Sequence, residues 1–83
     1  MAQYWMQYRC RTCAHSLGVV VTLDTDPQAA ADECAQPPAG NLCPKCSQTL
    51  RADGSPYGDA WELTTLRLQP GRWLSIVGGR VLA

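Results

Sequence analysis

The sequence predicts a small, mostly β protein with one short helix, a small α+β fold. The strand prediction rests on alternating or β-branched runs in residues 4–9, 19–23 and 60–77. An Asp-Pro pair followed by an Ala-rich stretch predicts a short helix at about residues 27–36. Two Cys-x-x-Cys pairs complete the pattern, and in a chain of 83 residues they indicate a metal site that supplements a small apolar core.

The first cysteine pair is predicted to lie at the bend of a hairpin. Tyr4, Met6 and Tyr8 share one face of a strand that runs into Cys10, because side chains alternate along a strand. After this pair, the letters AHSLG are typical of a turn, and VVVTL at residues 19–23 is β-branched and typical of the returning strand.

The helix is predicted from its boundaries. Asp26 is a suitable N-cap and Pro27 fits the first turn, while Pro37 requires the helix to end before it. A helix of this length is unstable alone, so we expect it to dock on the rest of the domain. The side that docks is expected to include Ala30, Ala31 and Cys34.

The C-terminal third, residues 60–83, is predicted to form a β-hairpin after a loop at residues 52–59. Residues 47–51 are expected to be a short strand before that loop. A four-residue turn around Pro70 and Gly71 would place Leu68 opposite Trp73. Both faces of the hairpin are then partly apolar, so one covers the core and the other must meet a second element or a partner.

The chain is expected to form a single domain, residues 1–83, with a metal-binding core at residues 1–52. Its formal net charge is zero, which argues against a strong nonspecific polyanion binder. Acids nevertheless gather between residues 24 and 33, and basic residues gather around the cysteine pairs. No apolar stretch has the length of a signal peptide or a membrane span, so we expect a cytoplasmic protein without a membrane partner.

Four cysteines are the predicted metal ligands: Cys10, Cys13, Cys43 and Cys46. Zinc takes four ligands in a tetrahedron and thiolates suit it, so each pair supplies two corners of one site. We therefore expect one Zn²⁺ per chain. Cys34 is expected to be a buried residue of the helix, and His15 a residue beside the site, although either side chain could replace a ligand.

The segments YRCRTCAHS and LCPKCSQTL resemble the zinc ribbon, or rubredoxin-like, superfamily. The resemblance is limited to the two Cys-x-x-Cys knuckles and implies a core of two knuckle hairpins, here followed by an added C-terminal hairpin. Members often carry Gly directly after each knuckle, where this chain has Ala14 and Ser47. Rubredoxins bind iron at a similar spacing, so a rubredoxin-like iron electron-transfer protein is an alternative, although their acidic and aromatic surroundings are missing from this sequence.

No enzyme is expected, because four cysteines close the metal shell and the sequence lacks the motifs of zinc deaminases, zinc proteases and phosphate-binding loops. The sequence favours a protein-interaction module or adaptor, of the kind found among bacterial and phage accessory proteins. Its apolar hairpin could bind a protein partner or form a homodimer. The alternative is a nucleic-acid-binding zinc ribbon. The candidate partner-binding residues are Arg9, Arg11, Lys45, Arg51, Trp5, Trp61 and Trp73.

Overall fold

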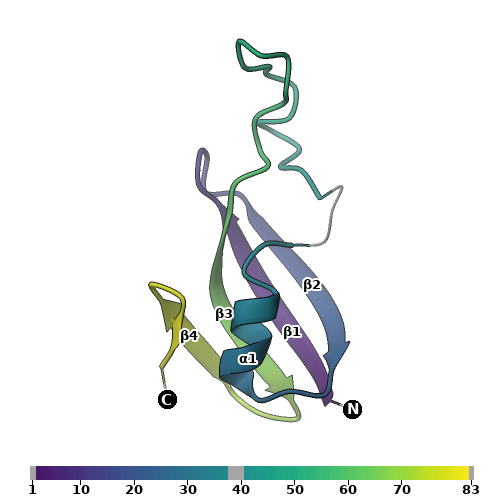
Figure 1. The fold of residues 1–83 in the computed structure, drawn as a ribbon, viewed down its shortest axis with the longest axis vertical. Helices are drawn as coiled ribbons and strands as arrows, with labels where there is room; N and C mark the ends of the chain where they lie inside the picture. The colour runs from purple at the N-terminus through teal and green to yellow at the C-terminus, as the bar shows by residue number, and fades with distance from the viewer. Residues whose placement is uncertain (1, 38–40, 83) are drawn as a thin grey trace.

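The computed structural model describes residues 2–37 and 41–82, which form one antiparallel sheet with a helix packed on one face (Figure 1). The elements are β1 (Ala2–Cys10), β2 (Ser16–Leu23), α1 (Pro27–Glu33), β3 (Trp61–Gln69), β4 (Trp73–Val77) and β5 (Arg80–Val81). The strand order is β2-β1-β3-β4-β5, so the N-terminal and C-terminal hairpins join in a single sheet. The prediction of a mostly β protein with one short helix is confirmed.

Strand β1 supplies the centre of the core. Its alternation buries Tyr4, Met6, Tyr8 and Cys10 almost completely, as the period of two predicts. Both buried tyrosines still satisfy their hydroxyl groups. Tyr4 donates to the carbonyl oxygen of Thr25 and Tyr8 to that of Cys34, each at 2.5 Å. These two bonds fasten both ends of the α1 segment to the sheet.

Helix α1 begins as predicted and ends earlier than predicted. The Asp26 carboxylate accepts the N–H of Ala29 at 2.8 Å, and Pro27 occupies the first turn. Ala30 and Ala31 are buried against the sheet. The helix ends at Glu33 instead of residue 36, because the chain leaves helical geometry at Cys34, whose carbonyl accepts the Tyr8 hydroxyl rather than a further helical N–H.

A β-bulge at Thr64 gives β3 a single apolar face. Tyr8 pairs with Leu63 and Gln7 pairs with Thr65, so Thr64 is an extra residue in the ladder. Its hydroxyl donates to the carbonyl oxygen of Gln7 at 3.2 Å. The extra residue shifts the alternation by one position. Apolar residues on both sides of it therefore face α1: Trp61, Leu63, Leu66 and Leu68.

The predicted pairing of the C-terminal hairpin is wrong by one residue. Trp73 lies opposite Arg67 instead of Leu68, and Leu74 lies opposite Leu66. Gly71 fits this turn because a Cβ there would overlap the carbonyl oxygen of Leu68. The sequence prediction also missed β5, which pairs with β4 after a turn in which Gly78 and Gly79 both have positive φ, 58° and 81°.

Residues 41–60 extend beyond the end of the sheet, at the top of Figure 1. They contain turns and one isolated bridge, between Leu50 and Pro56, so the strand predicted at residues 47–51 is absent from this described segment. The zinc-ribbon resemblance implies a core of two knuckle hairpins, but in the described residues only the first knuckle is flanked by paired strands. In the part of the chain that the structure describes, no helix is long and apolar enough to cross a membrane.

The sheet face opposite α1 is called the open face below. It carries Trp5, Val20, Arg67, Trp73 and Val77, together with polar residues between them. None of these five side chains is buried.

Candidate metal centre

Four cysteine sulfurs meet where the first hairpin touches the 41–60 segment. The Sγ atoms of Cys10, Cys13, Cys43 and Cys46 all lie within 4.8 Å of one another. The Sγ–Sγ distance is 3.3 Å between Cys13 and Cys43 and 3.9 Å between Cys10 and Cys46, so each sulfur of the first knuckle has a neighbour from the second. Both pairs are free thiols rather than disulfides.

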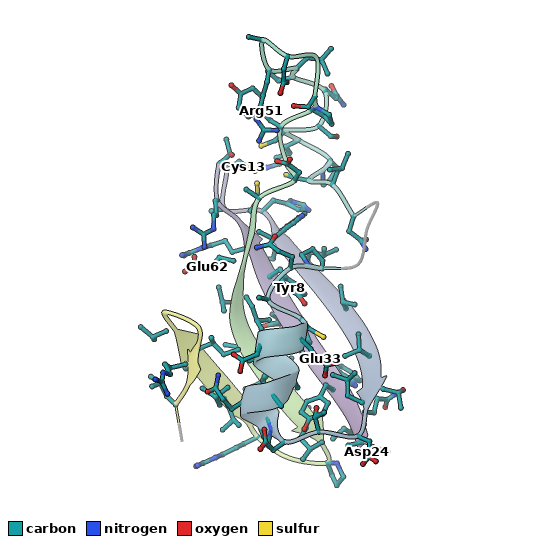
Figure 2. The ribbon with its side chains drawn as sticks, in the orientation of Figure 1. Tyr8, Cys13, Asp24, Glu33, Arg51 and Glu62 are labelled. Atoms are coloured by element: carbon teal, nitrogen blue, oxygen red, sulfur yellow. The ribbon has the colours of Figure 1, made fainter. Side chains whose placement is uncertain are left out.

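This arrangement fits a tetrahedral metal ion. With Zn–S distances of about 2.3 Å, sulfurs at the corners of a tetrahedron lie about 3.8 Å apart. The separations in the cluster bracket that value. Three of the cysteines are buried and Cys13 is exposed, so the cluster sits under the surface with one edge toward solvent. Figure 2 shows Cys13 at the junction between the sheet and the 41–60 segment.

The first knuckle is a tight turn at the end of β1. The N–H of Cys10 donates to the carbonyl of His15 at 2.8 Å, and the N–H of Ala14 donates to the carbonyl of Cys10 at 2.9 Å. Ala14 has a φ of 63°, the left-handed region that favours glycine. The position where zinc ribbons often carry Gly is thus strained by its Ala side chain.

The second knuckle depends on Gly58. The N–H of Cys43 donates to the carbonyl of Gly58 at 3.0 Å, and the N–H of Ser47 donates to the carbonyl of Cys43 at 2.9 Å. A Cβ on Gly58 would lie 2.9 Å from the Cβ of Cys43, and its φ is 94°. Sequence reasoning treated Gly58 only as a loop residue. The backbone of Gly58 instead packs against the knuckle.

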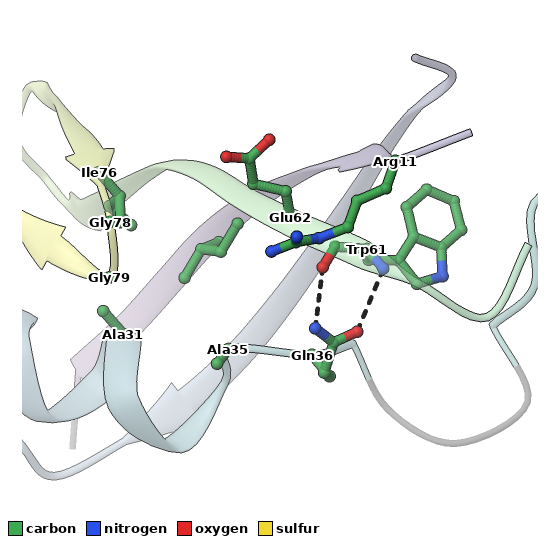
Figure 3. A pocket seen from close by; sticks show the side chains of 10 residues that line it. Arg11, Ala31, Ala35, Gln36, Trp61, Glu62, Ile76, Gly78 and Gly79 are labelled. Atoms are coloured by element: carbon green, nitrogen blue, oxygen red, sulfur yellow. Dashed lines mark hydrogen bonds between the residues drawn. The ribbon is translucent and has the colours of Figure 1, made fainter. Parts of the chain in front are cut away.

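Trp61 holds the chain that leads to the second knuckle. It pairs with Cys10 across β1 and β3 and is only 1% exposed. Its indole N–H donates to the carbonyl of Asn41 at 2.9 Å. Gln36 makes two bonds to its backbone, donating to the Trp61 carbonyl at 2.8 Å and accepting its N–H at 3.2 Å (Figure 3). Trp61 therefore belongs to the core beneath the metal cluster, and its indole is unavailable to a partner.

Arg51 organises the loop between the second knuckle and β3. It makes a bidentate ion pair with Asp59, at 2.7 and 3.2 Å, and donates to the carbonyl of Pro56 at 2.9 Å. Its guanidinium lies 4.7 Å from the centroid of the Tyr57 ring. Hydrogen bonding from Arg51 lowers the pKa of Asp59. Arg51, labelled in Figure 2, is thus engaged within its own loop.

The pKa values of two thiols in the cluster, Cys10 and Cys46, shift in opposite directions. Burial raises the pKa of Cys10, but hydrogen bonds from the backbone N–H groups of Cys13 and Thr12 and from neighbouring thiols outweigh it, and the pKa falls to about 7. Hydrogen bonding with Cys13, supported by burial, raises the pKa of Cys46 to about 12. Adjacent thiolates repel, so deprotonation of one makes deprotonation of the next harder. A metal that binds all four as thiolates must displace their remaining protons.

The other sequence candidates are spread over the molecule. The side chains of His15 and Cys34 lie outside the four-sulfur cluster. Arg9 forms an ion pair with Glu62 at 2.8 Å, whereas Arg11 and Lys45 are exposed at the two knuckles. Trp5 and Trp73 are exposed on the open face, whereas Lys45 lies in the 41–60 segment beyond the end of the sheet. The structure thus separates the knuckle cations from the exposed indoles.

No known protein-family model, curated protein or solved structure matches this chain. The likeness to the zinc ribbon therefore rests on the cysteine spacing and on the cluster that the four cysteines form.

Proposed function

We propose that this chain is a non-catalytic zinc protein, with one structural zinc ion bound by Cys10, Cys13, Cys43 and Cys46. The observation that carries this proposal is the convergence of four sulfurs within 4.8 Å from two segments 29 residues apart. Four thiolates complete a tetrahedral shell, so no position remains for a water or substrate. The ion would act as a cross-link rather than as a reaction centre.

The need for such a cross-link follows from the 41–60 segment. The bridge between Leu50 and Pro56 lies within this segment, so no strand ladder holds the described part of the segment to the sheet. Its ends meet the sheet through single hydrogen bonds, such as that from the Trp61 indole to Asn41, and the contacts centred on Arg51 are local. In small domains of this kind the free energy of metal binding contributes directly to folding. Zinc would therefore fix the segment to the end of β1.

Recognition of a partner is the proposed role of the sheet. A protein-interaction surface on the C-terminal hairpin has little support, because Trp61, Leu63 and Ile76 are buried. Trp73 remains exposed, together with Trp5 on β1. The open face is therefore the recognition surface that we propose, whether for an adaptor's protein partner, a second copy or a nucleic acid.

Metal analysis of the protein purified without added metal tests this proposal. We expect about one zinc per chain, and loss of both zinc and cooperative melting in Cys10→Ser and Cys46→Ser. Cys34→Ser is the matched control, because Cys34 lies outside the cluster, and it should keep its zinc. Iron in the protein would favour the rubredoxin-like alternative, and a folded, metal-free chain would refute the proposal.

A further inference from the structure

Two exposed tryptophans on the open face flank one arginine. Val20, Trp5, Arg67 and Trp73 are successive cross-strand partners on β2, β1, β3 and β4, so they form one row across the sheet. Trp5 is 39% exposed and Trp73 40% exposed. The Arg67 guanidinium lies 6.0 Å from the centroid of the Trp5 ring, and its Nε donates to the carbonyl of Gly71 at 2.6 Å. The turn after β3 therefore holds Arg67 between the two indoles.

A hollow of about 370 Å³ lies beside this row, lined in part by Trp5, Gly18, Val20 and Trp73. Gly18 creates the space, since a Cβ there would meet no other heavy atom within 4 Å. The next row across the sheet is polar and contains Gln7, Thr65 and Ser75. The open face thus offers aromatic surface, a cation and hydrogen-bonding groups around one shallow depression.

The open face is positively charged although the whole chain is neutral. Its strands carry three arginines, Arg9, Arg67 and Arg80, against one acid, Glu62, which gives a net charge of +2. In the described chain, Glu62 pairs with Arg9, and no carboxylate lies within ion-pairing distance of Arg67. Acids gather elsewhere, in and just before α1, as Asp24 and Glu33 show in Figure 2. The charge therefore favours an anionic partner at the open face.

From this surface we infer that the chain binds single-stranded nucleic acid, with bases stacked on Trp5 and Trp73 and Arg67 directed at the backbone between them. This inference rests on the proposed function, which supplies the zinc-bound fold. Trp5 and Trp73 stand two strands apart, about 10 Å at the usual strand spacing, so each indole can stack one base. Unpaired bases are required, because paired bases hide their faces inside the duplex.

Charge also distinguishes this partner from a second copy of the chain. Burying an arginine in an interface without a countercharge is costly. Arg67 stands at the centre of the row. A phosphate backbone supplies the countercharge that a second copy of this face, with its own arginines, lacks. The row therefore fits a nucleic acid better than it fits a homodimer.

Fluorescence anisotropy with the zinc-loaded full chain tests the inference, using labelled oligothymidine DNA and oligouridine RNA of about 12 nucleotides. We expect binding at low salt that quenches tryptophan fluorescence and weakens as salt rises. Trp5→Ala and Trp73→Ala should each weaken binding about 5- to 150-fold, the loss expected for one stacked base. Gly18→Val should weaken it by filling the hollow, while its β-branched side chain suits a strand. Val77→Ala, an exposed change on the same face outside the row, should have no effect.

Three results would overturn the inference. The first is no binding by folded protein that carries zinc. The second is binding that both tryptophan variants retain, since charge alone would then explain it. The third is a dimer in sedimentation that Trp5→Ala converts to monomer without any oligonucleotide binding, because a second copy would then occupy the face. Zinc content and melting are measured on the same samples, so a failure of the zinc-bound fold is distinguished from a failure of binding.

Discussion

Replacing Gly58 by Ala perturbs the second knuckle where residue 58 packs against Cys43. A Cβ at this position would lie 2.9 Å from the Cβ and 3.0 Å from the backbone nitrogen of Cys43. Nonbonded carbon atoms normally keep about 3.5–4.0 Å between them, so Cys43 or the 56–59 backbone must shift. Either shift displaces a metal ligand or stretches the 3.0 Å bond from the Cys43 N–H to the Gly58 carbonyl.

The expected change in the free energy of unfolding has three parts. Steric overlap in a packed site costs about 1–3 kcal/mol. Positive φ at an Ala costs about 1–2 kcal/mol, and the lower entropy of the unfolded chain returns up to about 1 kcal/mol. Gly54→Ala is the matched control, because Gly54 also has positive φ, 88°, but no heavy atom within 4 Å of the added Cβ. The difference between the two variants therefore isolates the overlap, about 1–3 kcal/mol.

Competition for zinc with a chromophoric chelator measures this difference. Since metal binding and folding are coupled, Gly58→Ala should bind zinc about 5- to 150-fold more weakly than Gly54→Ala. Thermal melting of both zinc-loaded variants should give the same order. Equal zinc affinity in the two variants would show that the second knuckle does not depend on the close approach of residue 58.

Two further changes test the knuckle turn and the buried tyrosine. Ala14→Gly should raise the free energy of unfolding by about 0.5–1 kcal/mol in denaturant titration, because glycine adopts the left-handed backbone at residue 14 without strain. Ser47→Gly is the control, because Ser47 lacks a positive φ, and it should not raise this free energy. Equal effects of the two changes would rule out relief of strain as the cause. Burial, with a smaller effect from Cys34, raises the pKa of Tyr8 from 10.0 to about 12, so ionisation of Tyr8 leaves the free energy of unfolding unchanged below pH 10 and lowers it as the pH rises toward 12. Tyr8→Phe should cost about 1 kcal/mol at neutral pH yet flatten this alkaline loss in melts across the pH range, and an unchanged alkaline slope would exclude Tyr8 as the titrating group.

The sequence predicted the features that depend on residues close together in the chain. Alternation from Tyr4 to Tyr8 identified the buried face of β1, and Asp26 and Pro27 identified the start of α1. The spacing of the cysteines predicted the metal cluster, since two matched Cys-x-x-Cys pairs in a small chain have few other uses. Each of these features is set by neighbours within a few residues.

Features set by contacts distant in sequence were missed. The bulge at Thr64 shifts the phase of β3, and only the doubled threonine between Leu63 and Leu66 marked it. That shift turned Trp61 and Leu66 to the same face and buried the surface expected on the hairpin. The role of Gly58 follows from its contact with Cys43, fifteen positions earlier in the sequence, which no local pattern reveals.

X-ray absorption at the metal edge, on protein purified without added metal, examines the four-thiolate zinc site itself. We expect zinc with four sulfur neighbours at about 2.3 Å and no nitrogen or oxygen neighbour. A shell that contains nitrogen or oxygen would mean that another group replaces a cysteine at the metal. Either that shell or an iron edge would be incompatible with a structural zinc ion bound by Cys10, Cys13, Cys43 and Cys46.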